Sequence, residues 1–291
     1  MFQTFFEIKS FYQSFIYHQF NDLLIQEVSS TASCERPPLN VSFETLNHNR
    51  VYLLSLIPDY INVKLIDGYK GIKVQNKEIS SYALLSEYKS FDDYAENQLG
   101  NKKISKIRKS RNKLESSFNI AYKMYYGAIE SAHYDYLFET MKSFIIERFQ
   151  QKNEQHIELK NIEEHKRKAF DLILQKKASI FVIYNGEIPI DICLNYHFEK
   201  TMISYFGSFD TNYSKYSLGY IDILKLVEWC FENDYKLFSL GLGSMEYKSE
   251  FCNNYNPCYG YIIYYKKNFL SKFMSNILAL VYKTKARLKK E

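Results

Sequence analysis

Residues 179–242 change from strand-type to helix-type periodicity within one continuous stretch, and this order constrains the fold more than any other feature. The run 179–184 is apolar and rich in β-branched residues, and Asn185-Gly186 after it is a hairpin turn signal. Further strands are expected over 187–198 and 201–209. Three strands joined by short turns predict an antiparallel meander.

A polar loop over 210–219 follows the third strand and leads into an amphipathic helix. The apolar residues of this helix recur at helical spacing: Ile223, Leu226, Val227, Cys230 and Phe231. A strand over 236–242 comes next. Strands followed by a loop, a helix and another strand predict an α+β fold, with mixed, mostly antiparallel sheets flanked by helices.

The rest of the chain fits the same fold class. Strands are predicted over 51–57, 61–66 and 259–265, and helices over 92–118, 134–150, 162–175 and 268–291. A chain of 291 residues is long enough for about two domains.

Charge and cysteine content exclude several classes. The net charge of +5 comes from 38 basic and 33 interspersed acidic residues, so no nucleic-acid partner is expected. The five cysteines have irregular spacing, which predicts reduced thiols and no metal site. The N-terminal residues lack the basic and apolar regions of a signal peptide, and no stretch approaches the roughly 20 apolar residues of a spanning helix. We therefore expect a cytoplasmic protein.

The loop before the amphipathic helix suits a diphosphate. A helix start presents unpaired N–H groups and the positive end of the helix dipole. Ser217 is a natural N-cap residue, Gly219 permits close backbone approach, and Lys215 adds a mobile positive charge. An ordinary capped loop between a strand and a helix explains the same residues.

Four spaced segments resemble the acetyltransferase domain of the GNAT superfamily. They are Tyr205-Phe206-Gly207-Ser208-Phe209-Asp210, Tyr216-Ser217-Leu218-Gly219, Leu237-Phe238-Ser239-Leu240-Gly241-Leu242-Gly243 and Glu246-Tyr247-Lys248-Ser249-Glu250-Phe251. The resemblance covers about residues 135–251 and is nearest to the polysaccharide-biosynthesis branch, which is related to the Fem-type peptidoglycan aminoacyltransferases. In one departure, Ser239 stands where the family often has Asp.

This resemblance implies two fused GNAT-like halves. Residues 1–117 would be a degenerate half that contacts the acceptor, and 118–291 the half that binds acyl-CoA, either acetyl-CoA or a longer acyl-CoA. The residues implied to bind the cofactor are Ser214, Lys215, Tyr216, Ser217, Leu218, Gly219 and Tyr220.

The resemblance extends to a basic helix over 102–113, where related proteins contact acceptor phosphates. Arg108 and Arg111 are the expected phosphate ligands, and a solvated helix face is the alternative. Tyr205, Tyr247 and Lys248, which lie in the matching segments, are the other expected substrate contacts.

Three residues are candidates for a catalytic base. Asp191 and His197 lie six residues apart on one predicted strand, so their side chains share a face. Glu246 lies in the last matching segment. A surface histidine, a buried aspartate with a polar partner, or no base at all are the alternatives.

The resemblance implies an N-acyltransferase that moves an acyl group from acyl-CoA to a nucleotide-linked amino sugar for surface polysaccharide biosynthesis. One alternative is Fem-type aminoacyl transfer to a peptidoglycan precursor. Another is a non-enzymatic membrane-surface or partner-binding protein, since the basic C-terminal helix has an apolar face. Docking of that helix on the core explains the same face.

Overall fold

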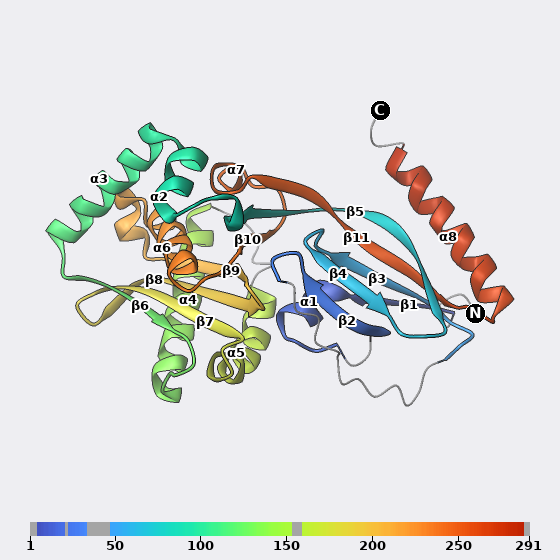
Figure 1. Cartoon of the computed structure of the whole chain (residues 1–291). Helices are drawn as coiled ribbons and strands as arrows, with labels where there is room; N and C mark the ends of the chain where they lie inside the picture. The colour runs from blue at the N-terminus through green and yellow to red at the C-terminus, as the bar shows by residue number, and fades with distance from the viewer. Residues whose placement is uncertain (1–4, 21–22, 34–46, 153–158, 288–291) are drawn as a thin grey trace. The chain divides into compact units, whose positions relative to one another are not determined.

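The computed structural model describes residues 5–20, 23–33, 47–152 and 159–287 (Figure 1). The chain divides into two compact units. The terminal unit comprises Met1–Ser81, Leu242–Lys248 and Asn254–Glu291, and the central unit comprises Tyr82–Gly241 and Ser249–Asn253.

Two groups of strands and one long C-terminal helix make up the terminal unit. Its elements are β1 (Phe6–Ser10), α1 (Phe11–Ile16), β2 (Ile25–Ser30), β3 (Val51–Ile57), β4 (Ile61–Leu65), most of β5 (Tyr69–Leu84), β11 (Asn254–Tyr265) and α8 (Phe269–Arg287). The strand order is β1-β3-β11-β5, and β2 pairs with β4. β1 runs parallel to β3, whereas β11 is antiparallel to it.

The central unit is a strand meander with helices around it. Its first part contains η1 (Leu85–Glu87), α2 (Phe91–Tyr94), the π-helical η2 (Ala95–Leu99), α3 (Asn101–Ser117), β6 (Ile120–Tyr125), α4 (Ser131–Lys152) and α5 (Leu159–Leu174). Its second part contains β7 (Ala178–Asn185), β8 (Ile188–Phe198), β9 (Thr201–Phe209), the 3₁₀ helix η3 (Thr211–Tyr216), α6 (Leu218–Glu232), β10 (Leu237–Leu242) and α7 (Lys248–Phe251).

The strands of this unit form a mixed sheet with the order β10-β9-β8-β7-β6. β6, β7, β8 and β9 are antiparallel neighbours, and β10 runs parallel to β9. The α+β prediction is therefore confirmed. Asn185 pairs with Ile188, so Gly186 begins the two-residue turn of the predicted hairpin, with φ of +61°.

A continuous buried layer beneath α6 explains why the meander and the helix fold together. Leu226, Val227 and Cys230 of α6 are fully buried in a core that also holds Phe181 and Met202 from the sheet. The apolar period of α6 predicts this face, because residues three and four apart lie on one side of a helix.

The two compact units do not divide the chain at the boundary expected at residue 117. α3 belongs to the central unit, whereas β11 and α8 belong to the terminal unit. Whether 1–117 and 118–291 are two GNAT-like halves stays a prediction. Strands β1, β2, β5 and β6 lie outside the predicted strands. In β5, four charged residues among sixteen obscure the alternation.

Candidate functional site

The pairing of β9 with β10 stops shortly after both strands begin. The register runs from Thr201–Leu237 to Ile203–Ser239, and β9 continues to Phe209. After Ser204, the register of β9 against β8 shifts and Tyr205 becomes an extra residue between two paired ones. A bulge of this kind bends the strand and disrupts the regular ladder locally. β9 therefore bulges shortly after the point where its pairing with β10 ends.

η3 connects this part of β9 to α6. The Asp210 side chain accepts a hydrogen bond of 2.9 Å from the Asn212 amide and caps η3. Ser217 precedes α6 in the left-handed region, with φ of +59°, and its side chain makes no capping bond. The expected Ser217 side-chain cap is therefore wrong, because capping requires an extended residue at this position. The Ser217 carbonyl instead accepts from the amides of Tyr220 and Ile221.

The predicted cofactor-binding side chains divide into buried and accessible ones. Tyr216 and Leu218 are buried, and Tyr216 packs edge-on against Phe118. Ser214 and Lys215 are exposed. A Cβ at Gly219 would lie 3.6 Å from the Phe209 ring, so this glycine leaves the start of α6 open without being required by the packing. The exposed side chains are thus Ser214 and Lys215, at the end of η3.

A polar cluster at the start of α6 includes two residues that the sequence did not single out. Lys103 Nζ lies 2.6 Å from Glu250 Oε2 and 4.4 Å from the centroid of the Tyr220 ring. The Tyr220 hydroxyl donates to Glu250 Oε1 at 3.3 Å. The Glu250 carboxylate raises the pKa of Lys103. No periodicity signals this cluster, because its members come from α3, α6 and α7.

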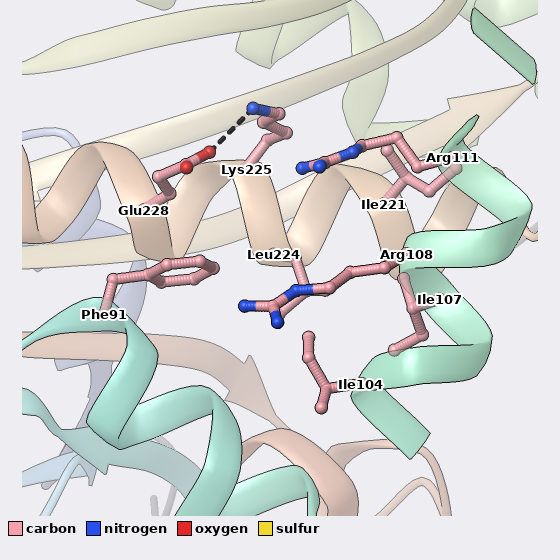
Figure 2. Close-up of a pocket in the computed structure, with 9 residues that line it drawn as sticks. All are labelled: Phe91, Ile104, Ile107, Arg108, Arg111, Ile221, Leu224, Lys225 and Glu228. Carbon is pink, nitrogen blue, oxygen red and sulfur yellow. Dashed lines mark hydrogen bonds and ion pairs between the residues drawn. The ribbon is translucent and has the colours of Figure 1, made fainter. Parts of the chain in front are cut away.

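The predicted phosphate ligands Arg108 and Arg111 line one hollow between α3 and α6 (Figure 2). Lys225 of α6 lines the same hollow, which is open to solvent. The remaining lining residues are Phe91, Ile104, Ile107, Ile221, Leu224 and Glu228. The lining thus combines three cationic side chains with a group of apolar ones.

The cations of this hollow already have acidic neighbours. Arg108 lies 2.8 Å from the exposed Asp92, and Lys225 lies 2.7 Å from Glu228. Arg111 Nε lies 3.6 Å from Glu115 Oε1, beyond hydrogen-bond distance. This nitrogen atom is buried and has no hydrogen-bond partner among the described residues. A bound anion would therefore compete with these carboxylates, and Arg111 Nε has unused donor capacity.

Asp191 is buried beside a second carboxyl group. It is 1% exposed, and its Oδ2 has no hydrogen-bond partner in the described part of the chain. Burial, followed by the proximity of Asp222 on α6, raises the pKa of Asp191 well above its usual value. Burial likewise raises the pKa of Asp222 to about 8. This pair favours a state in which at least one carboxyl holds a proton.

His197 is also buried, contrary to the alternative of a surface histidine. Its Nε2 lies 2.8 Å from Ser179 Oγ, and its ring packs among those of Tyr126, Trp229 and Tyr235. Asp191 and His197 both face residues of α6, as their even separation predicts. Their catalytic roles stay predictions, and in this structure both side chains are closed off from solvent.

Tyr205, the bulged residue of β9, takes part in a cluster with α5 that the sequence did not reveal. Its ring lies 4.7 Å from that of His165 and 5.4 Å from that of Tyr196. His165 Nδ1 and the Tyr196 hydroxyl are 2.6 Å apart. Burial lowers the pKa of His165 to about 4, so this imidazole is neutral at physiological pH.

The three expected site residues of the last matching segment lie in the terminal unit. Glu246 and Tyr247 are exposed. Lys248 is buried, and its Nζ donates to the Leu242 carbonyl at 2.6 Å, which closes the turn after β10. Within the described ranges, no group of three or more His, Cys, Asp or Glu side chains is arranged to hold a metal ion.

Comparison with known families identifies the central unit. Residues 101–249 match the family described as "Acetyltransferase (GNAT) domain". The chain belongs to this GNAT acetyltransferase family. It is therefore an acyl-CoA-dependent N-acyltransferase, and acyl-CoA is its co-substrate. The membership rests on a segment that contains the β9 bulge, η3, α6 and both arginines of the hollow.

Solved structures of similar shape have low sequence identity to this GNAT protein. A conserved protein of unknown function from Bacteroides thetaiotaomicron has 10% identity and a TM-score of 0.46, over 73% of this chain and 70% of that one. The C-terminal domain of a putative lysylphosphatidylglycerol synthetase from Agrobacterium fabrum has 13% identity and a TM-score of 0.43, over 81% and 72%.

A tandem GNAT protein from the clavulanic acid biosynthesis pathway has 7% identity and a TM-score of 0.36, over 74% and 64%. The curated proteins compared with the chain gave no match.

Proposed function

We propose that this GNAT enzyme transfers an acyl group from acyl-CoA to the amino group of a nucleotide-linked amino sugar, in the cytoplasm, for surface polysaccharide biosynthesis. The observation that carries the proposal is the hollow in which Arg108, Arg111 and Lys225 converge above an apolar floor. A nucleotide-linked sugar combines a diphosphate with rings, and this lining matches both parts.

The proposed acyl-CoA site lies along the edge of β9 and at the start of α6. The edge of β9 that extends past its pairing with β10 carries the bulge at Tyr205. We assign to this edge the hydrogen bonds to the amide-bearing arm and the thioester carbonyl of acyl-CoA, as an added strand would make them. The start of α6, with Ser214 and Lys215 nearby, receives the diphosphate.

The proposed acceptor site uses the cationic side chains of the hollow. The guanidinium groups of Arg108 and Arg111 donate to the two phosphates of the acceptor, while Arg108 exchanges Asp92 and Lys225 exchanges Glu228 for the same anion. The exchange is favourable because a diphosphate carries more charge than either carboxylate it replaces. Phe91 offers an apolar ring at the rim of the hollow.

The chemistry requires a neutral amine and a stabilised oxyanion. The amine attacks the thioester carbon and the carbonyl oxygen gains negative charge. The C–S bond then breaks, and the thiolate of CoA leaves and takes up the proton that the amine loses. We assign the stabilisation of that oxygen to backbone N–H groups of β9 near the bulge. Glu246 is the exposed carboxylate among the candidate bases, whereas Asp191 and His197 are buried.

The acceptor assignment is tested with a panel of nucleotide-linked amino sugars, each incubated with several acyl-CoAs and followed by mass spectrometry. We expect an acylated nucleotide sugar to form, and no product from the same amino sugar without its nucleotide diphosphate. Acylation of the free amino sugar at an equal rate would contradict a role of the diphosphate in binding the acceptor.

The hollow is tested with Arg111→Gln and Arg108→Gln. Loss of a charge-assisted hydrogen bond should raise the KM for the nucleotide sugar by about tenfold or more, while the KM for acyl-CoA stays unchanged. Lys106→Gln and Lys109→Gln are matched controls, because these exposed lysines lie on α3 but do not line the hollow. Equal effects of the control and test substitutions would contradict the assignment.

A further inference from the structure

Helix α8 (Phe269–Arg287) docks on the sheet of the terminal unit with one face. Ser271 and Ser275 are fully buried, and Ala279 is 5% exposed. The rest of this docked face packs into a core that includes Val51 and Ile262: Met274, Leu278 and Tyr282. The small residues allow close approach of the helix to the strands. One side of α8 is therefore buried against the sheet of the terminal unit.

A second apolar face of α8 has no such cover. Its six large side chains are 42% to 83% exposed and form what we call the exposed stripe: Phe269, Leu270, Phe273, Ile277, Leu280 and Val281. Their spacing of three, four and seven residues places them along one side of the helix. Soluble monomers rarely leave so many large apolar side chains exposed together, so the stripe indicates an interaction surface.

The charged residues of α8 are all basic. Between Glu250 and Glu291 the sequence has no acidic residue but eight basic ones. Lys272 and Lys283 each follow a stripe residue by three positions, so they line one edge of the stripe, and both are exposed. A second copy of this helix would bring the same positive charges against them, which disfavours self-association through the stripe.

We propose that α8 binds the surface of membranes that carry anionic lipids, with the exposed stripe inserted among the acyl chains and the lysines at the headgroups. An apolar face flanked by lysines is the pattern of an interfacial helix, and anionic headgroups supply the opposite charge. No helix in the described part of the chain is long and apolar enough to cross a bilayer. The helix lies along the surface, and the sheet of the terminal unit covers its opposite side.

The test is flotation of the full chain with phosphatidylcholine vesicles, with and without about 30% phosphatidylglycerol. We expect flotation with the anionic vesicles only. Substituting both Phe273→Gln and Leu280→Gln should weaken binding at least about tenfold, because it removes apolar surface from the stripe and leaves the docked face intact. Substituting both Lys272→Glu and Lys283→Glu should weaken binding by about tenfold or more.

Matched controls test whether the effects are specific to α8. Ile188→Gln removes a side chain that is 64% exposed at the β7–β8 turn, and Lys70→Glu with Lys77→Glu reverses two exposed charges on β5. Both controls should float like the unchanged chain. Circular dichroism and the thermal shift with acetyl-CoA should be the same for all variants, which separates this proposal from the acyl-transfer site.

Three results would overturn the proposal. The first is no flotation with either vesicle, and the second is equal flotation with neutral and anionic vesicles. The third is a dimer in light scattering that Phe273→Gln with Leu280→Gln dissociates, since that would make a second copy the occupant of the stripe.

Discussion

At the scale of single residues, the central unit buries two carboxyl groups that oppose each other's ionisation. Asp191 is identifiable from the sequence as a polar residue inside an apolar run. Asp222 is not, because the second turn of an amphipathic helix usually tolerates an aspartate at its surface. Only the packing of α6 on β8 places the two together, and their raised pKa values follow from that burial.

This pair predicts a pH-dependent stability. Burial raises the pKa of Asp222 from 3.8 to about 8, so its contribution to stability is present at low pH and is lost as pH rises through this window. Asp222→Asn cannot ionise. Its thermal midpoint relative to the unchanged chain should therefore rise by about 3 °C or more between about pH 5 and about pH 8.

The exposed Asp67 provides the control for that measurement. Asp67→Asn removes an exposed carboxyl, and the change with pH in the midpoint difference of Asp222→Asn should exceed the change for this surface substitution. A difference for Asp222→Asn that is the same at both ends of the pH range would show that Asp222 ionises normally in the folded protein.

At the scale of elements, the start of α6 combines a helix terminus with a glycine that the packing does not require. The loop sequence predicts the strand, loop and helix order, and the structure confirms it. The αL conformation of Ser217 was not predictable, since serine is common as an extended capping residue. The compact η3 turn imposes this conformation before the helix starts.

Gly219→Ala should have opposite effects on stability and binding. The backbone of Gly219 is outside the left-handed region, and its added Cβ makes ordinary contact with Phe209. Alanine should therefore stabilise the helix by about 0.5 kcal/mol. We propose that the acyl-CoA diphosphate binds beside this methyl group, so affinity should fall roughly tenfold. Calorimetric titration and thermal unfolding measure the two effects.

Glu232→Ala is the matched control on the same helix. Glu232 is exposed at the C-terminal end of α6, where an acidic residue opposes the helix dipole. Its removal should also stabilise the helix slightly, without a change in acyl-CoA affinity. If Gly219→Ala leaves affinity equally unchanged, the diphosphate does not bind at the start of α6.

At the scale of the whole molecule, the GNAT family match and the exposed stripe of α8 lie in different parts of the chain. The match covers residues 101–249, which include most of the central unit and the Leu242–Lys248 segment of the terminal unit. The exposed stripe lies in the terminal unit, outside the match. We therefore expect substitutions in the stripe to change the proposed membrane binding without changing the binding of acyl-CoA.

Acetyl-CoA should stabilise the central unit by mass action. At a ligand concentration about 100 times the Kd, the free energy of unfolding rises by about 2.7 kcal/mol, which raises the thermal midpoint by several degrees. Pantetheine lacks the diphosphate and should give a much smaller shift at the same concentration. Equal shifts with the two compounds would exclude a diphosphate contribution from η3 and α6.

The sequence by itself determined the local parts of this protein. Turn chemistry located the β7–β8 hairpin, apolar periodicity located α6 and its buried face, and spaced segments indicated the GNAT family. Tertiary structure alone decided which distant residues meet: Lys103 with Glu250, Asp191 with Asp222, and Arg111 beside Lys225. The reason is physical, since periodicity shows which side chains face a core but not which element packs against them.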